Sequence, residues 1–155
     1  SSYAATAAVR LRKEGQAAGA VQVYLATNSF IPDEPQYHPA TLVRFATPVQ
    51  DSARLIRAAR LGLRRIFRRG FRYKKAGVML LDLSAAGVRQ GDLFTDVADE
   101  RPARLMAVLD QVNREMGRGT LRFLAEGTEQ PWRMRRDSLT GRYSTDWDGL
   151  AVVNA

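Results

Sequence analysis

Residues 51–82 carry the whole net charge of this 155-residue chain, and their pattern has the period of a helix. Ten Lys or Arg residues stand there against Asp51 and Asp82, a balance of +8, whereas the fourteen basic and fourteen acidic residues elsewhere cancel. At 3.6 residues per turn, apolar and basic side chains separate onto opposite sides of a helix. The apolar side holds Leu55, Ile56, Ala59, Leu63, Ile66 and Phe67, and the other side holds Arg57, Arg60, Arg64 and Arg68, flanked by Arg54 and Arg65.

Such a helix packs on a core through one side and presents guanidinium groups on the other. Guanidinium is always charged, and its planar fork suits phosphate, so the pattern indicates a polyanionic partner such as nucleic acid. The pI of about 10.6 agrees with an acidic partner. With 45% hydrophobic and 26% charged residues the chain can build a core, and it lacks the long apolar run of a membrane span. It contains no cysteine, which excludes thiolate metal sites and permits a cytoplasmic location.

The segments around the basic helix predict an α+β fold. Residues 1–16 favour a helix, 20–27 alternate as a half-buried strand, 29–39 hold three prolines and indicate a loop, and 41–46 favour a second strand. Asp51 and Ser52 offer an N-cap for the basic helix, Gly70 offers its end, and residues 72–83 favour a long strand. The order helix, strand, strand, helix, strand predicts an antiparallel sheet with two helices on one face.

The remaining third of the chain predicts a linker followed by a small mixed extension. We expect a domain at 1–83, an exposed linker at 84–100 and an extension at 101–155. Pro102 suits the first turn of a helix that Gly117 and Gly119 would end, and 121–125 suit a further strand. The expected apolar stripe of this helix is Leu105, Met106, Leu109 and Val112.

Residues typical of catalysis are scarce. His38 is the one histidine and lies in the proline-rich loop, and the chain has no phosphate-binding loop of the Walker type. The acids Asp146 and Asp148, around Trp147, are better explained as a solvated turn than as a magnesium site. We therefore expect a binding module with no metal, no cofactor and no catalytic residues, and no membrane partner.

The basic residues of the helix and of the following strand predict a surface that grips a phosphate backbone without reading bases. The alternative is that these side chains pair with acids of the linker, namely Asp92, Asp96, Asp99 and Glu100. The candidate DNA-binding residues are Arg57, Arg60, Arg64, Arg68, Arg72, Lys74 and Lys75.

A second motif lies in the linker, where Leu93 and Phe94 form an isolated apolar pair three residues after Gln90. An extended peptide with a glutamine and an aliphatic–aromatic pair is suited to an apolar groove on a partner. This form resembles the sliding-clamp-binding peptide of bacterial replication and repair proteins. The alternative is that Leu93 and Phe94 fold back onto the sheet.

Several stretches, taken in order, resemble the C-terminal part of UmuC-type Y-family translesion DNA polymerases, the catalytic subunits of DNA polymerase V. The resemblance covers nearly the whole chain and includes YKKAGVML at 73–80 and GRGTL at 117–121. The other stretches are 1–4, 47–52, 90–94, 132–134 and 142–145.

The resemblance implies that residues up to about 83 form a little finger domain, which lies against duplex or primer–template DNA in error-prone synthesis during DNA repair and the SOS response. It implies that Gln90, Leu93 and Phe94 dock on the sliding clamp. It further implies contacts of the C-terminal portion with the polymerase accessory subunit and the recombinase filament. The family's palm, with its metal-binding carboxylates, has no counterpart here, so we expect no polymerase activity from this chain alone. The family's first strand also has no counterpart, so we expect an exposed sheet edge.

Two other functions fit the same features. An α/β module that binds RNA would need aromatic side chains on adjacent strands, for which Tyr24, Phe45 and Tyr73 are the candidates. A protein-interaction domain would use the basic surface against an acidic partner. Competition between single-stranded RNA and duplex DNA separates the first from DNA binding, and negligible DNA affinity would indicate the second.

Overall fold

The computed structural model describes residues 1–31, 33–86 and 101–128, and it confirms the expected α+β class. Gln90, Leu93 and Phe94 of the expected clamp-binding peptide lie outside the described residues. The elements follow in the order α1 (Ser2–Lys13), β1 (Gln16–Thr27), β2 (Ala40–Val49), α2 (Ser52–Ile66), β3 (Tyr73–Ala85), α3 (Arg101–Glu115) and the single 3₁₀ turn η1 (Leu124–Glu126).

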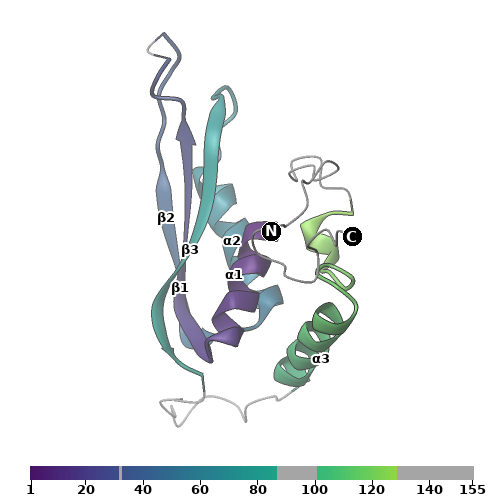
Figure 1. The fold of residues 1–155 in the computed structure, drawn as a ribbon. Helices are drawn as coiled ribbons and strands as arrows, with labels where there is room; N and C mark the ends of the chain where they lie inside the picture. Colours follow the sequence, from purple (N-terminus) through teal and green to yellow (C-terminus); the bar gives the residue numbers. More distant parts are fainter. Residues whose placement is uncertain (32, 87–100, 129–155) are drawn as a thin grey trace, which may run out of the picture.

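The three strands form an antiparallel sheet in the order β2-β1-β3. Figure 1 shows α1 and α2 together on one face of this sheet, as the sequence predicted, and no helix of the described ranges covers the other face. Val21, Val23 and Leu25 of the central strand are buried under the helices, whereas the alternate residue Tyr24 is exposed. This alternation is expected of a sheet with one covered face, because successive side chains point to opposite sides.

Helix α2 follows the predicted pattern for most of its length. The side chain of Asp51 accepts hydrogen bonds from the backbone N–H groups of Ala53 and Arg54, which satisfies donors that a helix start leaves unpaired. Leu55 is completely buried, and Ile56, Ala59 and Ile66 are buried beside it.

Two residues assigned to that apolar side were predicted wrongly. Leu63 is 40% exposed and Phe67 is 52% exposed. The helix ends at Ile66, so Phe67 has an extended backbone and its ring turns toward Tyr73 instead of the core. Gly70, with φ +91°, lies in the turn that follows and does not itself end the helix.

Helix α3 adds a third layer on the side of α1 and α2 that faces away from the sheet (Figure 1). Arg12 of α1 joins this layer to the rest through four hydrogen bonds. Its Nε and Nη2 donate to the two carboxylate oxygens of Asp110 at 2.6 and 2.7 Å. Its Nη1 donates to the carbonyl oxygen of Gln50 and to Oγ of Ser52, both at 2.9 Å. The Arg12 side chain is only 8% exposed, so this is a buried joint between α1, α3 and the start of α2.

The segment around α3 departs from the prediction in two ways. Met106 is 1% exposed, but Leu105, expected on the same stripe, is 58% exposed. The expected strand at 121–125 is absent, because the Asn113 side chain accepts hydrogen bonds from the N–H groups of Gly119 and Leu121 and donates to the Leu121 carbonyl. These bonds hold the chain in a compact turn that leads into η1.

The edge of the sheet at β3 carries a shallow hollow. Since β3 pairs only with β1 among the described strands, its outer edge is unpaired there. The hollow, about 540 Å³, lies between α1 and this edge and is lined by Tyr3, Leu11, Met79 and Leu83 among others. No helix in the described part of the chain is long and apolar enough to cross a membrane.

Candidate nucleic-acid interface

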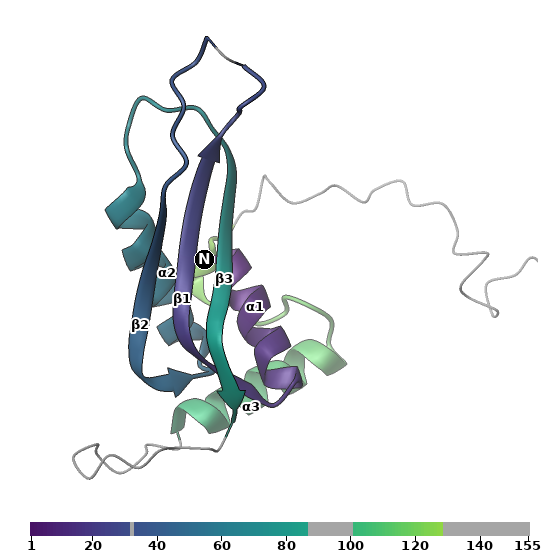
Figure 2. The same cartoon turned by 90° about the vertical axis from the view of Figure 1, so that its left-hand side faces the viewer.

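Seven basic residues gather at one end of the sheet, which we call the basic end. They come from the last turn of α2, from the connection to β3 and from the first residues of β3. Figures 1 and 2 show that these segments and the β1–β2 loop lie at the same end of the molecule. The basic end comprises Arg64, Arg65, Arg68, Arg69, Arg72, Lys74 and Lys75.

All seven side chains of the basic end are exposed, and little in the described residues neutralises them. Arg72 pairs with Glu34 at 2.6 Å, and the guanidinium of Arg68 lies over the Tyr37 ring at 4.9 Å. The other five form no ion pair with any acid that the structure describes. The Arg72 side chain is 84% exposed, and an ion pair so open to water contributes little. The basic end can therefore accept an anion without first breaking a strong contact with another described residue; the linker acids Asp92, Asp96, Asp99 and Glu100 lie outside the described residues.

An aromatic cluster fixes the backbone beneath these charges. The rings of Tyr37 and Phe71 stack at 4.8 Å, and Tyr73 lies 6.3 Å from Phe71. The Tyr73 hydroxyl donates to the Arg68 carbonyl at 2.9 Å and accepts from the Arg68 N–H at 3.0 Å. The Tyr37 hydroxyl donates to the carbonyl of Ile66, the last residue of α2. The α2–β3 connection is thus held at both its start and its end.

The sequence analysis missed this cluster and two of the seven basic positions. Arg69 was not a candidate, and Arg65 was named only as a flank of the helix. The available signal was the spacing of Phe67, Phe71 and Tyr73 around Gly70, which places aromatic rings on either side of a tight turn.

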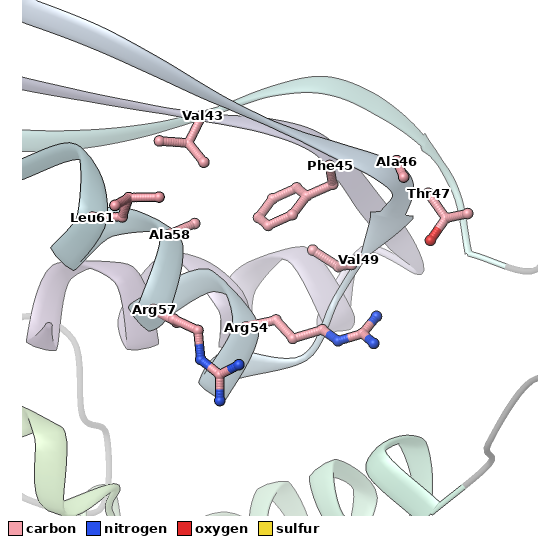
Figure 3. A pocket seen from close by; sticks show the side chains of 9 residues that line it. All are labelled: Val43, Phe45, Ala46, Thr47, Val49, Arg54, Arg57, Ala58 and Leu61. Atoms are coloured by element: carbon pink, nitrogen blue, oxygen red, sulfur yellow. The ribbon is translucent and has the colours of Figure 1, made fainter.

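The first half of α2 carries a separate group of arginines. Figure 3 shows Arg54 and Arg57 extending from this half of α2 away from the sheet, while Val43 and Phe45 lie between the helix and the strands. These four residues border an apolar groove of about 360 Å³ between β2 and α2. Arg57 precedes Arg64 by seven residues, about 10 Å along the helix axis.

The predicted residues therefore fall into two groups. The structure brings five of them to one end of the sheet, namely Arg64, Arg68, Arg72, Lys74 and Lys75. Arg57 and Arg60 lie about one to two turns closer to the N-terminus of α2. Arg60 lies near the Ser1 amino group, which is a like charge. Burial lowers the pKa of this amino group, Glu126 acts against this shift, and Arg60 adds to it.

The described residues contain no group of three or more His, Cys, Asp or Glu side chains that could hold a metal ion. Three acids lie near the basic segment in the sequence, and each has a separate partner: these are Glu34, Asp51 and Asp82. Glu34 and Asp82 pair with arginines, and Asp51 caps α2. This part of the chain offers charge and a rigid backbone, which suit binding to phosphates.

Comparison with known proteins gives two family matches that together span most of the chain. Residues 1–93 match the impB/mucB/samB family C-terminal domain. Residues 103–153 match a domain of unknown function, DUF4113.

Curated relatives match over almost the same length of this chain. The protein UmuC of Salmonella typhimurium is 44% identical over 153 residues, which cover 98% of this chain and 36% of that protein. The proteins ImpB of Salmonella typhimurium and MucB of Escherichia coli are 38% and 36% identical over 152 residues. The chain spans about a third of the length of each of these relatives.

Proposed function

The chain belongs to the impB/mucB/samB family, whose C-terminal domain it contains, and from this premise we propose that it is the DNA-binding and clamp-docking part of an error-prone translesion DNA polymerase. The parent protein would act in DNA repair and SOS mutagenesis in the cytoplasm. This part would not catalyse nucleotidyl transfer, since its role is to hold DNA and a partner.

The observation that carries the proposal is the basic end. Seven exposed cationic side chains lie on the α2–β3 connection and on the helix and strand ends beside it, and aromatic contacts and hydrogen bonds hold this connection in place. A cation that is already positioned loses little conformational freedom when it meets a phosphate, so the arrangement favours binding. Contacts from these cations to phosphates carry no sequence information, so such a grip suits an enzyme that must accept damaged DNA of any sequence.

In this mechanism the basic end supplies the main phosphate contacts. Arg64, Arg68, Arg72, Lys74 and Lys75 are the predicted members, and Arg65 and Arg69 add to them. Arg57 and Arg60 extend the same positive surface along α2. Arg72 would exchange its exposed contact with Glu34 for a phosphate oxygen.

The clamp-docking part of the proposal concerns Gln90, Leu93 and Phe94. Gln90 and Leu93 lie in the last residues of the first family match and Phe94 directly follows it, before the second match begins at 103, which supports a peptide that joins two domains. We propose that Leu93 and Phe94 enter an apolar groove of the sliding clamp and that Gln90 hydrogen-bonds at its rim. The 101–155 segment would meet the accessory subunit or the recombinase filament.

The salt dependence of DNA binding tests the proposal. If about four phosphates are neutralised, the logarithm of the association constant for duplex DNA falls with the logarithm of salt concentration with a slope near −3.6. Fluorescence anisotropy of a labelled duplex at several salt concentrations measures this slope, with single-stranded RNA as competitor. A flat slope, or preference for the RNA, would reject DNA as the ligand.

The clamp assignment has its own test. Replacing Leu93 and Phe94 by Ala should abolish binding to the bacterial sliding clamp and leave duplex affinity unchanged, as measured by surface plasmon resonance on both ligands. Equal clamp affinity in the double variant and the parent would refute the assignment.

A further inference from the structure

We propose that Phe30, in the β1–β2 loop, stacks on an unpaired DNA base next to the basic end. This inference rests on the proposed function and adds to it a contact that does not depend on charge. The Phe30 side chain is 94% exposed, whereas Tyr37 of the same loop is partly buried and stacks on Phe71. Figures 1 and 2 show the loop projecting beyond the end of the sheet.

The loop that carries Phe30 is ordered by its own hydrogen bonds. The side-chain amide of Gln36 lies within hydrogen-bonding distance of the carbonyl oxygens of Asn28, Ile31 and Glu34, at 3.1, 3.0 and 3.0 Å. The side-chain oxygen of Gln36, Oε1, accepts a hydrogen bond from the Thr27 hydroxyl at 2.7 Å. The exposed Gln36 side chain thus ties the start of the loop to its end, which leaves Phe30 little freedom to fold back onto the sheet.

The loop also has a fixed backbone at Phe30 itself. The N–H of Phe30 donates to Oδ1 of Asn28 at 3.3 Å, and the N–H of Ile31 donates to the Asn28 carbonyl at 3.2 Å. These two bonds define a tight turn over residues 28–31, and Phe30 lies within it. An aromatic side chain presented by such a turn is already oriented for a contact, which lowers the entropy lost on binding.

Two contacts connect this loop directly to the basic end. Glu34 of the loop accepts from Arg72 at 2.6 Å. Tyr37, at the end of the loop, stacks with Phe71 at 4.8 Å and carries the Arg68 guanidinium over its ring. A DNA strand held by the basic end would therefore lie beside the loop, and its bases would be the apolar surfaces within reach of Phe30.

The physics favours an unpaired base over a paired one. Within a duplex both faces of a base are covered by its neighbours, and inserting a side chain requires unstacking them at considerable cost. An unpaired base has a free face, on which an aromatic ring stacks with little regard to sequence. A primer–template junction, where a single-stranded overhang leaves the duplex, offers both this free face and a phosphate backbone for the basic end.

The experiment compares the parent chain with Phe30→Ala on two labelled DNAs, a primer–template with a 5′ single-stranded overhang and a blunt duplex of equal duplex length. The full 155-residue chain is used, and circular dichroism verifies folding. We expect Phe30→Ala to weaken binding to the overhang DNA about fivefold or more, the usual range for losing one stacked base, with an unchanged salt slope. Blunt-duplex affinity should change less than twofold, and Phe30→Tyr should restore the overhang affinity.

Leu124→Ala is the matched control, since Leu124 is also highly exposed, at 84%, but lies in η1 away from this loop. It should leave both affinities unchanged. The inference is overturned if Phe30→Ala leaves overhang binding intact, or if it weakens both DNAs equally. In that case a salt slope near −3.6 for the parent chain would still support the proposed function. A flat slope would reject both the Phe30 contact and DNA binding by the basic end.

Discussion

Arginine serves opposite purposes at the α1–α3 joint and at the basic end. At the joint, Arg12 is 8% exposed and makes four hydrogen bonds, two of them to the carboxylate of Asp110. At the basic end, Arg64, Arg65 and Arg69 are exposed and form no ion pair with any acid in the described ranges. The same side chain therefore holds the fold together in one region and is left available to a ligand in the other.

The difference shows that burial and hydrogen-bond partners, more than charge, decide whether an arginine stabilises the fold or is available to a ligand. A buried guanidinium must have its donors satisfied, because leaving it unpaired costs several kcal/mol. An exposed one loses little by exchanging water for phosphate, and counterion release favours that exchange. Arg12 should then control stability, and the basic end should control DNA affinity.

The largest effect is expected at the joint. Arg12→Ala leaves the carboxylate of Asp110 without its partner and should lower the free energy of unfolding by about 3 kcal/mol. Urea denaturation followed by circular dichroism measures this change. Arg10→Ala, an exposed arginine of the same helix, should change stability by no more than about 0.5 kcal/mol. Equal changes in the two variants would remove the distinction between the regions.

The next effect is on DNA binding. Replacing Arg69, Lys74 and Lys75 by Ala should make the salt slope clearly shallower, by about 0.9 for each phosphate contact that is lost. Replacing Arg54, Arg57 and Arg60 by Ala removes the same charge from the first half of α2 and should change the slope by less than half as much. Identical slopes in the two triple variants would show that only overall charge matters.

A smaller effect is expected from the aromatic cluster that supports the basic end. Tyr37→Leu removes a stacked ring and the hydrogen bond to the Ile66 carbonyl, which together should cost about 1–2 kcal/mol of stability. Duplex affinity should fall two- to threefold while the salt slope stays the same, since every cation is still present. Anisotropy and thermal unfolding measure the two quantities, and a change in slope would mean that the ring is needed to keep the cations in contact with phosphates.

The smallest effect concerns the start of α2. Asp51→Ala removes the side chain that caps Ala53 and Arg54 and should lower stability by about 1 kcal/mol. Asp51→Asn keeps a capping oxygen and should recover most of this loss. Neither variant should change duplex affinity beyond the small effect of one charge, because the cap lies at the opposite end of α2 from the basic end.

The sequence predicted the elements of the sheet domain because their patterns are local. Alternation in β1 and the 3.6-residue period of α2 each follow from which face is covered, and the structure confirms both. The end of α2 was placed too late, because Phe67 continues the apolar period although its ring belongs to the cluster with Tyr73. Periodicity alone does not reveal that a tertiary contact has replaced the helix.

The site was only partly predictable, for a related reason. Exposed arginines can be found from the helical pattern, but the joint at Arg12 depends on Asp110, which is 98 residues away in the sequence. The compact turn after α3 likewise depends on hydrogen bonds of the Asn113 side chain. The composition of 121–125 alone is that of a strand, which is why the sequence predicted one. Contacts of this kind follow from the packed fold and leave no local signal.

Amide chemical-shift mapping by solution NMR tests the central claim most directly. The isotope-labelled chain is titrated with a duplex that has a single-stranded overhang, at a salt concentration where binding is in fast exchange. We predict that the largest shifts fall on 64–75 and on the β1–β2 loop around Phe30, while the amides around Arg12 and Asp110 stay unchanged. Shifts centred on α3, or spread evenly over the chain, would contradict the assignment of the basic end as the DNA-binding surface.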